Sequence, residues 1–222
     1  MPQPQSQPPL SPDEKRRAIQ GALLAVRLYT NLIRCARLAN LSHRLRSMMD
    51  PVANAAGEDV LRACVVLLHS SFEDFMRTVT RFLLPTLDPK SLEKIAFPGK
   101  AGDRRPDAIE LVDLARYRGK SVDEVLESAV GAFCERLTLN NTTDVGALLR
   151  RLRIEADGLE HHYPVLAWMM ERRHKIAHEA DIVQDNPVRF RGFVATDLVQ
   201  YTHVFNTLQV FCLEGVLPAL TK

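Results

Sequence analysis

The chain has 222 residues, of which 46% are hydrophobic and 25% are charged, the composition of an ordinary globular domain rather than a disordered one. Its length fits one domain with a sizeable core, and its net charge of +2 is too small to establish a polyanionic partner. We predict a single domain over residues 11–222, preceded by a Pro/Gln tail at residues 1–10 that has little to bury and is expected to be disordered.

The first predicted helix begins at Ser11, where Ser-Pro-Asp-Glu forms a capping box with proline in the first turn. Its apolar residues recur at helical spacing until Asp50-Pro51, and we expect them to face the core: Ile19, Leu23, Val26, Ile33 and Leu41. Cations crowd the same helix, with few acids among them: Lys15, Arg16, Arg17, Arg27, Arg34, Arg37, Arg44 and Arg46. Such a helix either follows a phosphate backbone or presents a solvated face, and both interpretations stay open.

The second predicted helix is the most regular, with apolar residues from Val60 to Leu83 at intervals of three and four until Pro85. Residues 85–107 hold four prolines and two glycines and are expected to form a loop. Shorter helices should follow around 107–117, from Ser121 to about Leu139, and from Asn140 through Arg153, then a helix over 158–180, a turn or short hairpin over 181–195, and a last helix from Thr196. The pattern predicts an all-α bundle of four long helices with short inserted helices.

The four cysteines lie far apart within apolar helical patterns and show no metal-ligand spacing: Cys35, Cys64, Cys134 and Cys212. We therefore expect buried, reduced thiols. The N-terminus lacks a secretory signal pattern, and no stretch approaches the ~18 consecutive apolar residues that span a bilayer. These observations predict a soluble, cytoplasmic protein without a membrane partner.

The most informative stretch is ERRHKIAHEAD, residues 171–181. His174 and His178 lie one turn apart and should be neighbours on the helix surface. A buried guanidinium needs an opposing anion, which would be either a protein carboxylate or a ligand phosphate. We expect this for Arg173, since it continues the apolar seam formed by Leu166, Met169, Ile176 and Ala180.

Two chemistries suit these side chains. The spacing His174-x3-His178 is that of a zinc-binding helix, but Lys175 replaces the glutamate that would act as base, and no third ligand is well placed. We therefore expect no metal and no cofactor. Metal-free RNA cleavage needs groups that exchange protons near neutral pH and a cation for the crowded phosphorane. One arginine and one or two histidines meet that requirement.

The stretch resembles the HEPN superfamily, whose signature is Arg-x(4–6)-His with a polar residue after the arginine. Here Arg173 and His178 match it, while Arg172 would give the longer variant. Other segments strengthen the likeness. The segment LLHSSFEDFMR (67–77) looks like the family's early core helix. Three further segments, in this order along the chain, resemble the stand-alone RiboL-PSP-type branch: RGKSVDEVLESAV (118–130), LNNTTDV (139–145) and RRHKIAHEAD (172–181).

This resemblance implies a homodimeric, metal-independent endoribonuclease that acts as a toxin or anti-phage defence effector, with an RNA cleft shared by the two motif helices. Arg173 would hold the scissile phosphate, His178 would transfer a proton, and His174 would assist. The alternative is a HEPN-like module that binds RNA, nucleotides or proteins without catalysis. An antitoxin or other inhibitor encoded elsewhere is a further expected partner. The resemblance does not extend to control by adenylylation, since Ala180 stands where the branch controlled in that way has tyrosine.

Several residues have two interpretations. Glu73 and Asp74 would orient Arg173, or Glu73 would simply pair with Arg77 on the surface. Candidate RNA contacts outside the catalytic set lie beside the motif and in the proline-rich loop, although that loop could equally be an ordinary surface loop: Arg172, Lys100, Arg104 and Arg105.

Overall fold

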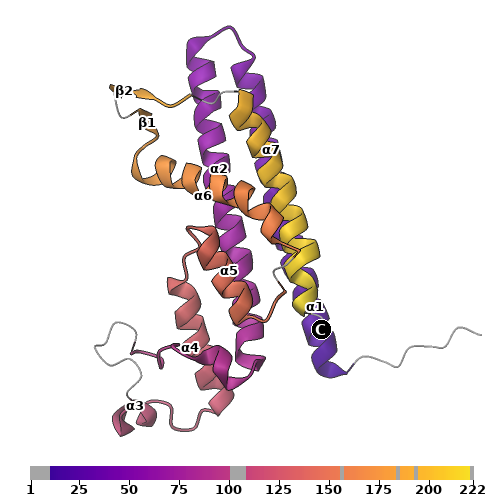
Figure 1. The fold of residues 1–222 in the computed structure, drawn as a ribbon, viewed down its shortest axis with the longest axis vertical. Coiled ribbons are helices and arrows are strands. Elements are labelled where there is room, and N and C mark those ends of the chain that lie inside the picture. The colour runs from indigo at the N-terminus through magenta and orange to yellow at the C-terminus, as the bar shows by residue number, and fades with distance from the viewer. Residues whose placement is uncertain (1–10, 101–108, 156–157, 184–185, 193–194, 221–222) are drawn as a thin grey trace, which may run out of the picture.

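The computed structural model describes residues 11–100, 109–155, 158–183, 186–192 and 195–220, and Figure 1 shows their arrangement. Within these ranges the protein is all-α except for one two-stranded hairpin. No helix in the described ranges combines the length and hydrophobicity needed to cross a membrane. Arg104 and Arg105, two of the predicted RNA contacts, lie outside the described residues.

The two longest helices, α1 (Pro12–Arg46) and α2 (Pro51–Leu83), form a long hairpin joined by a short turn. The predicted capping box is present: the Ser11 hydroxyl accepts from the Glu14 amide, and the Glu14 carboxylate accepts from the Ser11 amide. At the turn, Asp50 caps α2 by accepting from the Val52 amide. The predicted start of α1 at Ser11 is therefore confirmed, whereas α2 begins at Pro51, nine residues before the apolar pattern from which it was predicted.

The buried face of α1 differs from the predicted one. Its core row consists of Leu24, Leu28, Leu32 and Cys35. The residues expected to face the core are exposed, except Ile33, which is half-buried: Ile19, Leu23, Val26 and Leu41. This helix carries two apolar rows on opposite sides, and α2 covers only one of them. Helical periodicity identifies such rows but does not say which one the neighbouring helix will choose.

The remaining elements follow the predicted order with shorter bounds. Two 3-10 turns (Leu84–Thr86 and Pro89–Leu92) precede α3 (Leu111–Ala115), α4 (Val122–Arg136) and α5 (Thr142–Arg151). Another 3-10 turn (Glu160–His162) leads into α6 (Tyr163–His178), strands β1 (Ile182–Val183) and β2 (Asn186–Phe190), and α7 (Ala195–Gln209). The two strands pair antiparallel, as the predicted hairpin would.

The last helix is not α-helical throughout. After α7 the chain continues as a π-helix (Val210–Val216) and a 3-10 turn (Leu217–Leu220). Gly215 sits in the π-helical part, where an added Cβ would lie 2.3 Å from Cδ2 of Leu159. Only glycine therefore fits there without displacing Leu159.

The core is built around α2. Three large side chains of α2 are fully buried: Phe72, Phe75 and Met76. The Phe72 ring packs edge-on against the Phe211 ring, with 5.8 Å between the ring centroids. Helix α6 crosses α2, as Figure 1 shows, and adds a buried set of its own: Leu166, Met169 and Met170. All four cysteines are free and buried, which confirms that expectation.

Candidate functional site

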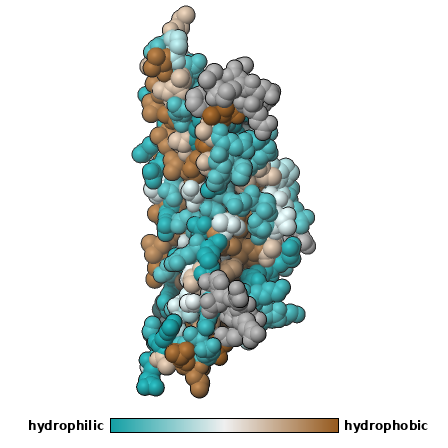
Figure 2. All heavy atoms as spheres, turned by 90° about the vertical axis from the view of Figure 1, so that its left-hand side faces the viewer, coloured by the Kyte–Doolittle hydropathy of each residue, from teal (hydrophilic) through white to brown (hydrophobic). Residues whose placement is uncertain are grey.

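The C-terminal turns of α6 hold most of the residues singled out in the sequence. Successive residues of an α-helix point about 100° apart, so neighbours can meet very different surroundings. Arg172 is buried, Arg173 is half-buried, and His174 and His178 are exposed. Figure 2 views the side of the molecule on which α6 ends, and hydrophilic side chains cover most of the middle of that face.

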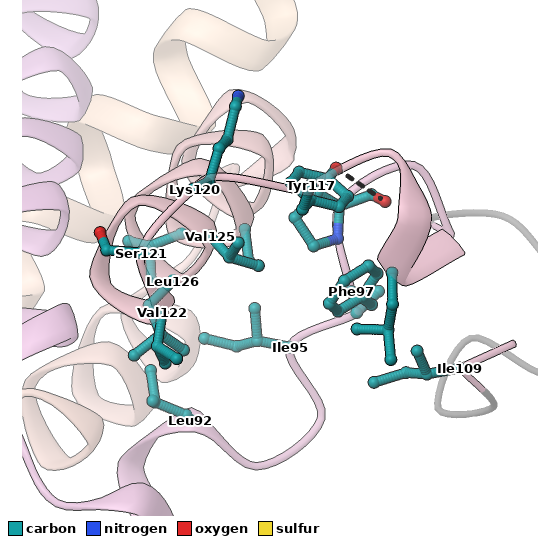
Figure 3. Close-up of a pocket in the computed structure, with 15 residues that line it drawn as sticks. Leu92, Ile95, Phe97, Ile109, Tyr117, Lys120, Ser121, Val122, Val125 and Leu126 are labelled. Atoms are coloured by element: carbon teal, nitrogen blue, oxygen red, sulfur yellow. Dashed lines mark hydrogen bonds between the residues drawn. The ribbon is translucent and has the colours of Figure 1, made fainter. Parts of the chain in front are cut away.

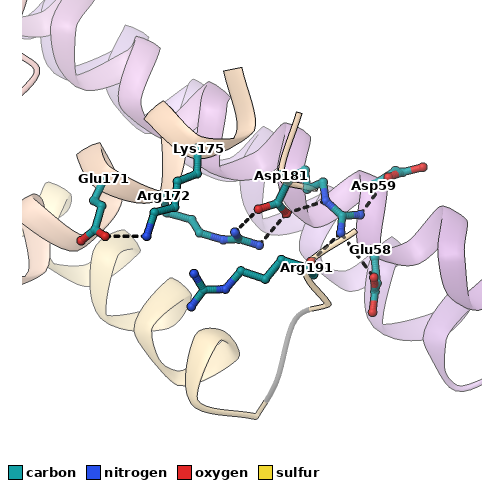
Figure 4. A network of polar contacts seen from close by, with 8 residues as sticks. Glu58, Asp59, Glu171, Arg172, Lys175, Asp181 and Arg191 are labelled. Carbon is teal, nitrogen blue, oxygen red and sulfur yellow. Dashed lines mark hydrogen bonds and ion pairs between the residues drawn. The ribbon is translucent and has the colours of Figure 1, made fainter. Parts of the chain in front are cut away.

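Arg172 forms a buried ion pair with Asp181. Its Nη2 donates to Asp181 Oδ2 at 2.7 Å and its Nη1 donates to Oδ1, while the two residues are only 3% and 2% exposed. The Nε of Arg62 on α2 donates to the same Oδ2 at 2.8 Å. One carboxylate thus serves two guanidiniums, as Figure 4 shows. We call Arg62, Arg172 and Asp181 the buried ion cluster.

Arg62 has further carboxylates around it. Its Nη1 donates to Asp59 at 2.9 Å, and its Nη2 lies 3.5 Å from Glu58. Burial lowers the pKa of Arg62, but the hydrogen bonds and charges of Asp181 and Asp59 outweigh this and hold the pKa above its ordinary value. Arg62 therefore stays charged and, through its hydrogen bond to Asp181, joins α2 to the end of α6.

A left-handed turn brings Asp181 back beneath α6. Ala180 and Asp181 have φ angles of 49° and 57°, and the Asp181 amide donates to the Lys175 carbonyl at 3.1 Å. The Asp181 carbonyl accepts from the Arg191 amide at 2.8 Å, and Arg62 Nη2 donates to the Arg191 carbonyl at 2.6 Å. The turn thus links α2, α6 and the segment that follows β2.

The buried seam position of α6 consequently belongs to Arg172 rather than to Arg173, where the sequence interpretation had placed it. Arg172 takes this position because the left-handed turn places Asp181 beside it. Asp181 supplies the anion that a buried guanidinium requires. Because the Arg172 guanidinium is buried and hydrogen-bonded to Asp181, it is not accessible to an RNA phosphate in this arrangement.

Arg173 and His178 lie together at the exposed end of α6. Arg173 Nη1 is 3.4 Å from His178 Nε2, and the His174 and His178 rings have centroids 4.8 Å apart. The two histidines are therefore neighbours, as predicted. No carboxylate of the described residues forms an ion pair with Arg173. We call Arg173, His174 and His178 the open cluster.

The chemistry of the Arg173–His178 contact follows from the guanidinium, which can only donate. The contact is a hydrogen bond only when Nε2 of His178 is unprotonated and offers its lone pair. In that tautomer the lone pair of Nε2 is occupied by the guanidinium and becomes free only when Arg173 turns to another acceptor, such as a phosphate. The arrangement combines a fixed positive charge with two imidazoles that can reach a ligand.

Behind the open cluster, α2 contributes a buried histidine that the sequence interpretation missed. His69 Nε2 donates to the Leu139 carbonyl at 3.1 Å, and its Nδ1 lies 4.0 Å from Glu73. Burial lowers the pKa of His69; Glu73 and the Leu139 carbonyl raise it, and the positive charges of Arg173 and Arg77 lower it again. The net shift is downward, which favours a neutral imidazole behind Arg173. Its position between Leu68 and Phe72 on the apolar face of α2 was the signal available in the sequence.

The two acids predicted to orient Arg173 have other partners. Glu73 accepts from the Leu139 amide at 3.0 Å and from Arg77 at 3.4 Å, so the alternative Glu73–Arg77 pair is present, although Glu73 is mostly buried. Asp74 forms an exposed ion pair with Arg27 of α1 at 2.7 Å.

Lys100, a predicted RNA contact, pairs with Asp113 of α3 at 3.0 Å. Hydrogen bonding to Lys100 is the main cause that lowers the pKa of the Asp113 carboxyl. Lys100 therefore ties the proline-rich loop to α3, which lies away from the end of α6 in Figure 1.

In the part of the chain that the structure describes, neither a metal-binding group of side chains nor a reactive thiol forms a second candidate site. No group of three or more His, Cys, Asp or Glu side chains there is arranged to hold a metal ion. Burial raises the pKa of Cys35 and of Cys134 to about 11, so these thiols are protonated at neutral pH and closed to substrates.

A separate cavity of about 570 Å³ lies between α3, the start of α4 and the residues after the second 3-10 turn. Its walls are mostly apolar, with Ile95, Phe97 and Val125 among them, and the Tyr117 hydroxyl is used within the wall, donating to the Pro98 carbonyl at 3.4 Å. Lys120 extends away from these apolar side chains in Figure 3. The described lining offers packing surface but no converging charged groups, so the open cluster is the stronger candidate site.

No protein-family model, no curated protein and no solved structure matches this chain.

Proposed function

We propose that this protein is a metal-independent endoribonuclease of the HEPN type, acting as a toxin or anti-phage defence effector. The observation that carries the proposal is the open cluster: Arg173 lies 3.4 Å from His178, with His174 beside it, at a solvent-exposed helix end. The resemblance of this segment to the Arg-x4-His signature supports the choice of reaction.

In the proposed reaction, a histidine accepts the proton of an RNA 2′-hydroxyl, and the 2′-oxygen attacks the adjacent phosphorus. The P–O5′ bond breaks, and the leaving 5′-oxygen receives a proton from a second imidazole or from water. The products are a 2′,3′-cyclic phosphate and a 5′-hydroxyl. His178 suits the role of base, because its Nε2 lies at the same helix end as Arg173, beside the place where that guanidinium would hold the phosphate.

Arg173 would stabilise the charge that builds up on the phosphoryl oxygens. A guanidinium presents two parallel N–H donors and remains charged at any cellular pH, which fits a phosphorane better than a neutral donor does. Since no described carboxylate pairs with Arg173, binding a phosphate does not first require the loss of an ion pair.

Two copies of the chain would complete the site. One helix end is convex and offers a single wall, whereas a cleft around an RNA strand needs a second wall. A partner copy that presents its own α6 would supply this wall and a second open cluster. The exposure of His174 and His178 leaves room for such an approach.

The test is cleavage of labelled total RNA in EDTA by wild-type protein and by His178→Ala, with His43→Ala as a matched control. His43 is also an exposed histidine but lies near the end of α1. We expect wild type and His43→Ala to cut, His178→Ala to lose about 10²-fold or more in rate, and the products to carry cyclic phosphates.

Other outcomes would point elsewhere. Cutting by wild type that EDTA abolishes would indicate a metal-dependent enzyme. RNA that binds at the open cluster but is never cut would favour the non-catalytic HEPN-like module. Equal cutting by His178→Ala and wild type would remove His178 from the mechanism.

A further inference from the structure

The outer face of α1 is not covered by any other element in the described part of the chain. Four of its large apolar side chains are more than half exposed: Ile19 at 60%, Leu23 at 58%, Val26 at 63% and Tyr29 at 52%. They lie opposite the buried row that faces α2. Single exposed apolar residues are normal on a protein surface, but a continuous row along one helix indicates an interaction surface.

The spacing of this row is that of a helix-pairing seam. Ile19, Leu23, Val26, Thr30 and Ile33 follow one another at intervals of four and three residues. An apolar row with this spacing can pack against a second helix by interlocking side chains. A flat sheet edge or a small molecule would not follow such a row along several helical turns.

The charge that α1 itself carries beside the seam is positive, and Asp74 of α2 is already paired with Arg27. Between Lys15 and Met49 the chain carries eight Lys and Arg residues and no Asp or Glu. Arg16, Arg34, Arg37 and Arg44 are exposed on α1, and no carboxylate in the described part of the chain forms an ion pair with any of them. A partner for this face must therefore bring its own negative charge.

We propose that the outer face of α1 docks an acidic amphipathic helix of another protein. The partner's apolar row would cover Leu23 and Val26, and its flanking carboxylates would meet Arg34 and Arg37. A second copy of this chain is disfavoured, because two faces with an excess of positive charge would meet. RNA is disfavoured because the centre of the face is apolar. The inference goes beyond the proposed nuclease activity and does not depend on it.

The test uses the full-length protein and two fluorescein-labelled synthetic helices that share a leucine seam. One carries glutamate beside the seam and the other carries lysine, and binding is followed by fluorescence anisotropy. We expect saturable binding of the acidic helix only, weakened by salt. Leu23→Gln should weaken it about 10-fold, because it removes a buried apolar contact. Arg34→Glu should weaken it by a similar factor through charge reversal. Leu111→Gln is the matched control, since Leu111 is 85% exposed on α3.

Five results would overturn the proposal. The acidic helix could fail to bind, or bind as well to Leu23→Gln as to wild type. Light scattering could show a dimer that Leu23→Gln dissociates, which would assign the face to a second copy. Binding that depends on Leu23 could appear with phosphatidylserine vesicles instead of the acidic helix, which would assign it to a membrane surface. Binding that depends on Arg34 but not on Leu23 could appear with a labelled oligouridine, which would assign it to RNA.

Discussion

Arg172 and Arg173 are adjacent in the chain and have the same side chain, yet the fold uses them in opposite ways. Arg172 is buried against Asp181 and shares that carboxylate with Arg62. Arg173 turns to the surface and has an imidazole, not a carboxylate, as its neighbour. The difference separates a guanidinium that stabilises the fold from one that is available to a ligand.

The contrast also shows how the two clusters depend on each other. The buried ion cluster fixes the end of α6 against α2 and against the chain after β2. The open cluster stands on the same two helical turns. We expect this fixed base to help Arg173 and His178 keep their short separation, since no carboxylate among the described residues forms an ion pair with Arg173.

The largest expected effect is on stability, in Asp181→Ala. The change leaves two buried guanidiniums without their shared carboxylate, and removing one member of a buried ion pair typically costs about 3–5 kcal/mol. Urea denaturation followed by circular dichroism would measure the loss. Asp59→Ala is the matched control, because Asp59 also pairs with Arg62 but its side chain is 77% exposed. We expect it to cost about 1 kcal/mol or less. Equal losses in the two variants would show that the buried ion cluster does not stabilise the fold.

The second effect is on activity, in Arg173→Gln. We expect RNA cleavage to fall by about 10²–10³-fold, as when a transition-state donor is removed. The free energy of unfolding should change by no more than about 0.5 kcal/mol, because no buried ion pair is broken. Arg172→Gln should behave in the reverse way, with lower stability as the primary defect. If Arg173→Gln were the less stable variant and Arg172→Gln the less active one, the assignment of the two arginines would be exchanged.

The sequence predicts the elements of this fold better than their partners. Ser11, Ser121 and Asn141 mark helix starts where the structure has them, because a cap is a local interaction. Which face of α1 is buried, and which of Arg172 and Arg173 is buried, depend on groups that are distant in the sequence. Leu23 and Leu24 are both leucines on a helix, and only the position of α2 decides which of them is buried.

The same reasoning applies to the site. The proximity of His174 and His178 follows from helix geometry, so the sequence predicts it. The role of Asp181 does not, since it requires a left-handed turn at Ala180, a residue with no particular preference for that conformation. His69 is hidden for a related reason: a histidine in an apolar row looks like ordinary core until Leu139 and Glu73 are placed beside it.

A smaller effect concerns the pH dependence of stability. Because the folded-state pKa of His69 lies below its ordinary value of 6.5, the unfolded chain takes up a proton at a pH where the folded protein does not. Stability should therefore fall as the pH drops below about 6.5, by up to about 1.4 kcal/mol per pH unit for one proton. His69→Gln, whose amide can still donate to the Leu139 carbonyl, should flatten this slope in urea denaturation between pH 7.5 and 5.5. An unchanged slope would mean that His69 binds its proton equally well in both states.

The smallest effect tests the turn that separates the two clusters. Ala180 has a φ of 49°, a conformation that costs a residue with a Cβ about 1 kcal/mol more than glycine. Ala180→Gly should therefore raise the free energy of unfolding by up to about 1 kcal/mol, measured by urea denaturation. Ala177→Gly, inside α6, is the matched control and should lower it by about 1 kcal/mol. RNA cleavage by Ala180→Gly should stay at the wild-type rate, because the variant keeps Asp181 beneath α6 and His178 at its end. A loss of cleavage together with a gain in stability would mean that the open cluster relies on strain in this turn, and the two arginine environments would then be coupled through the backbone.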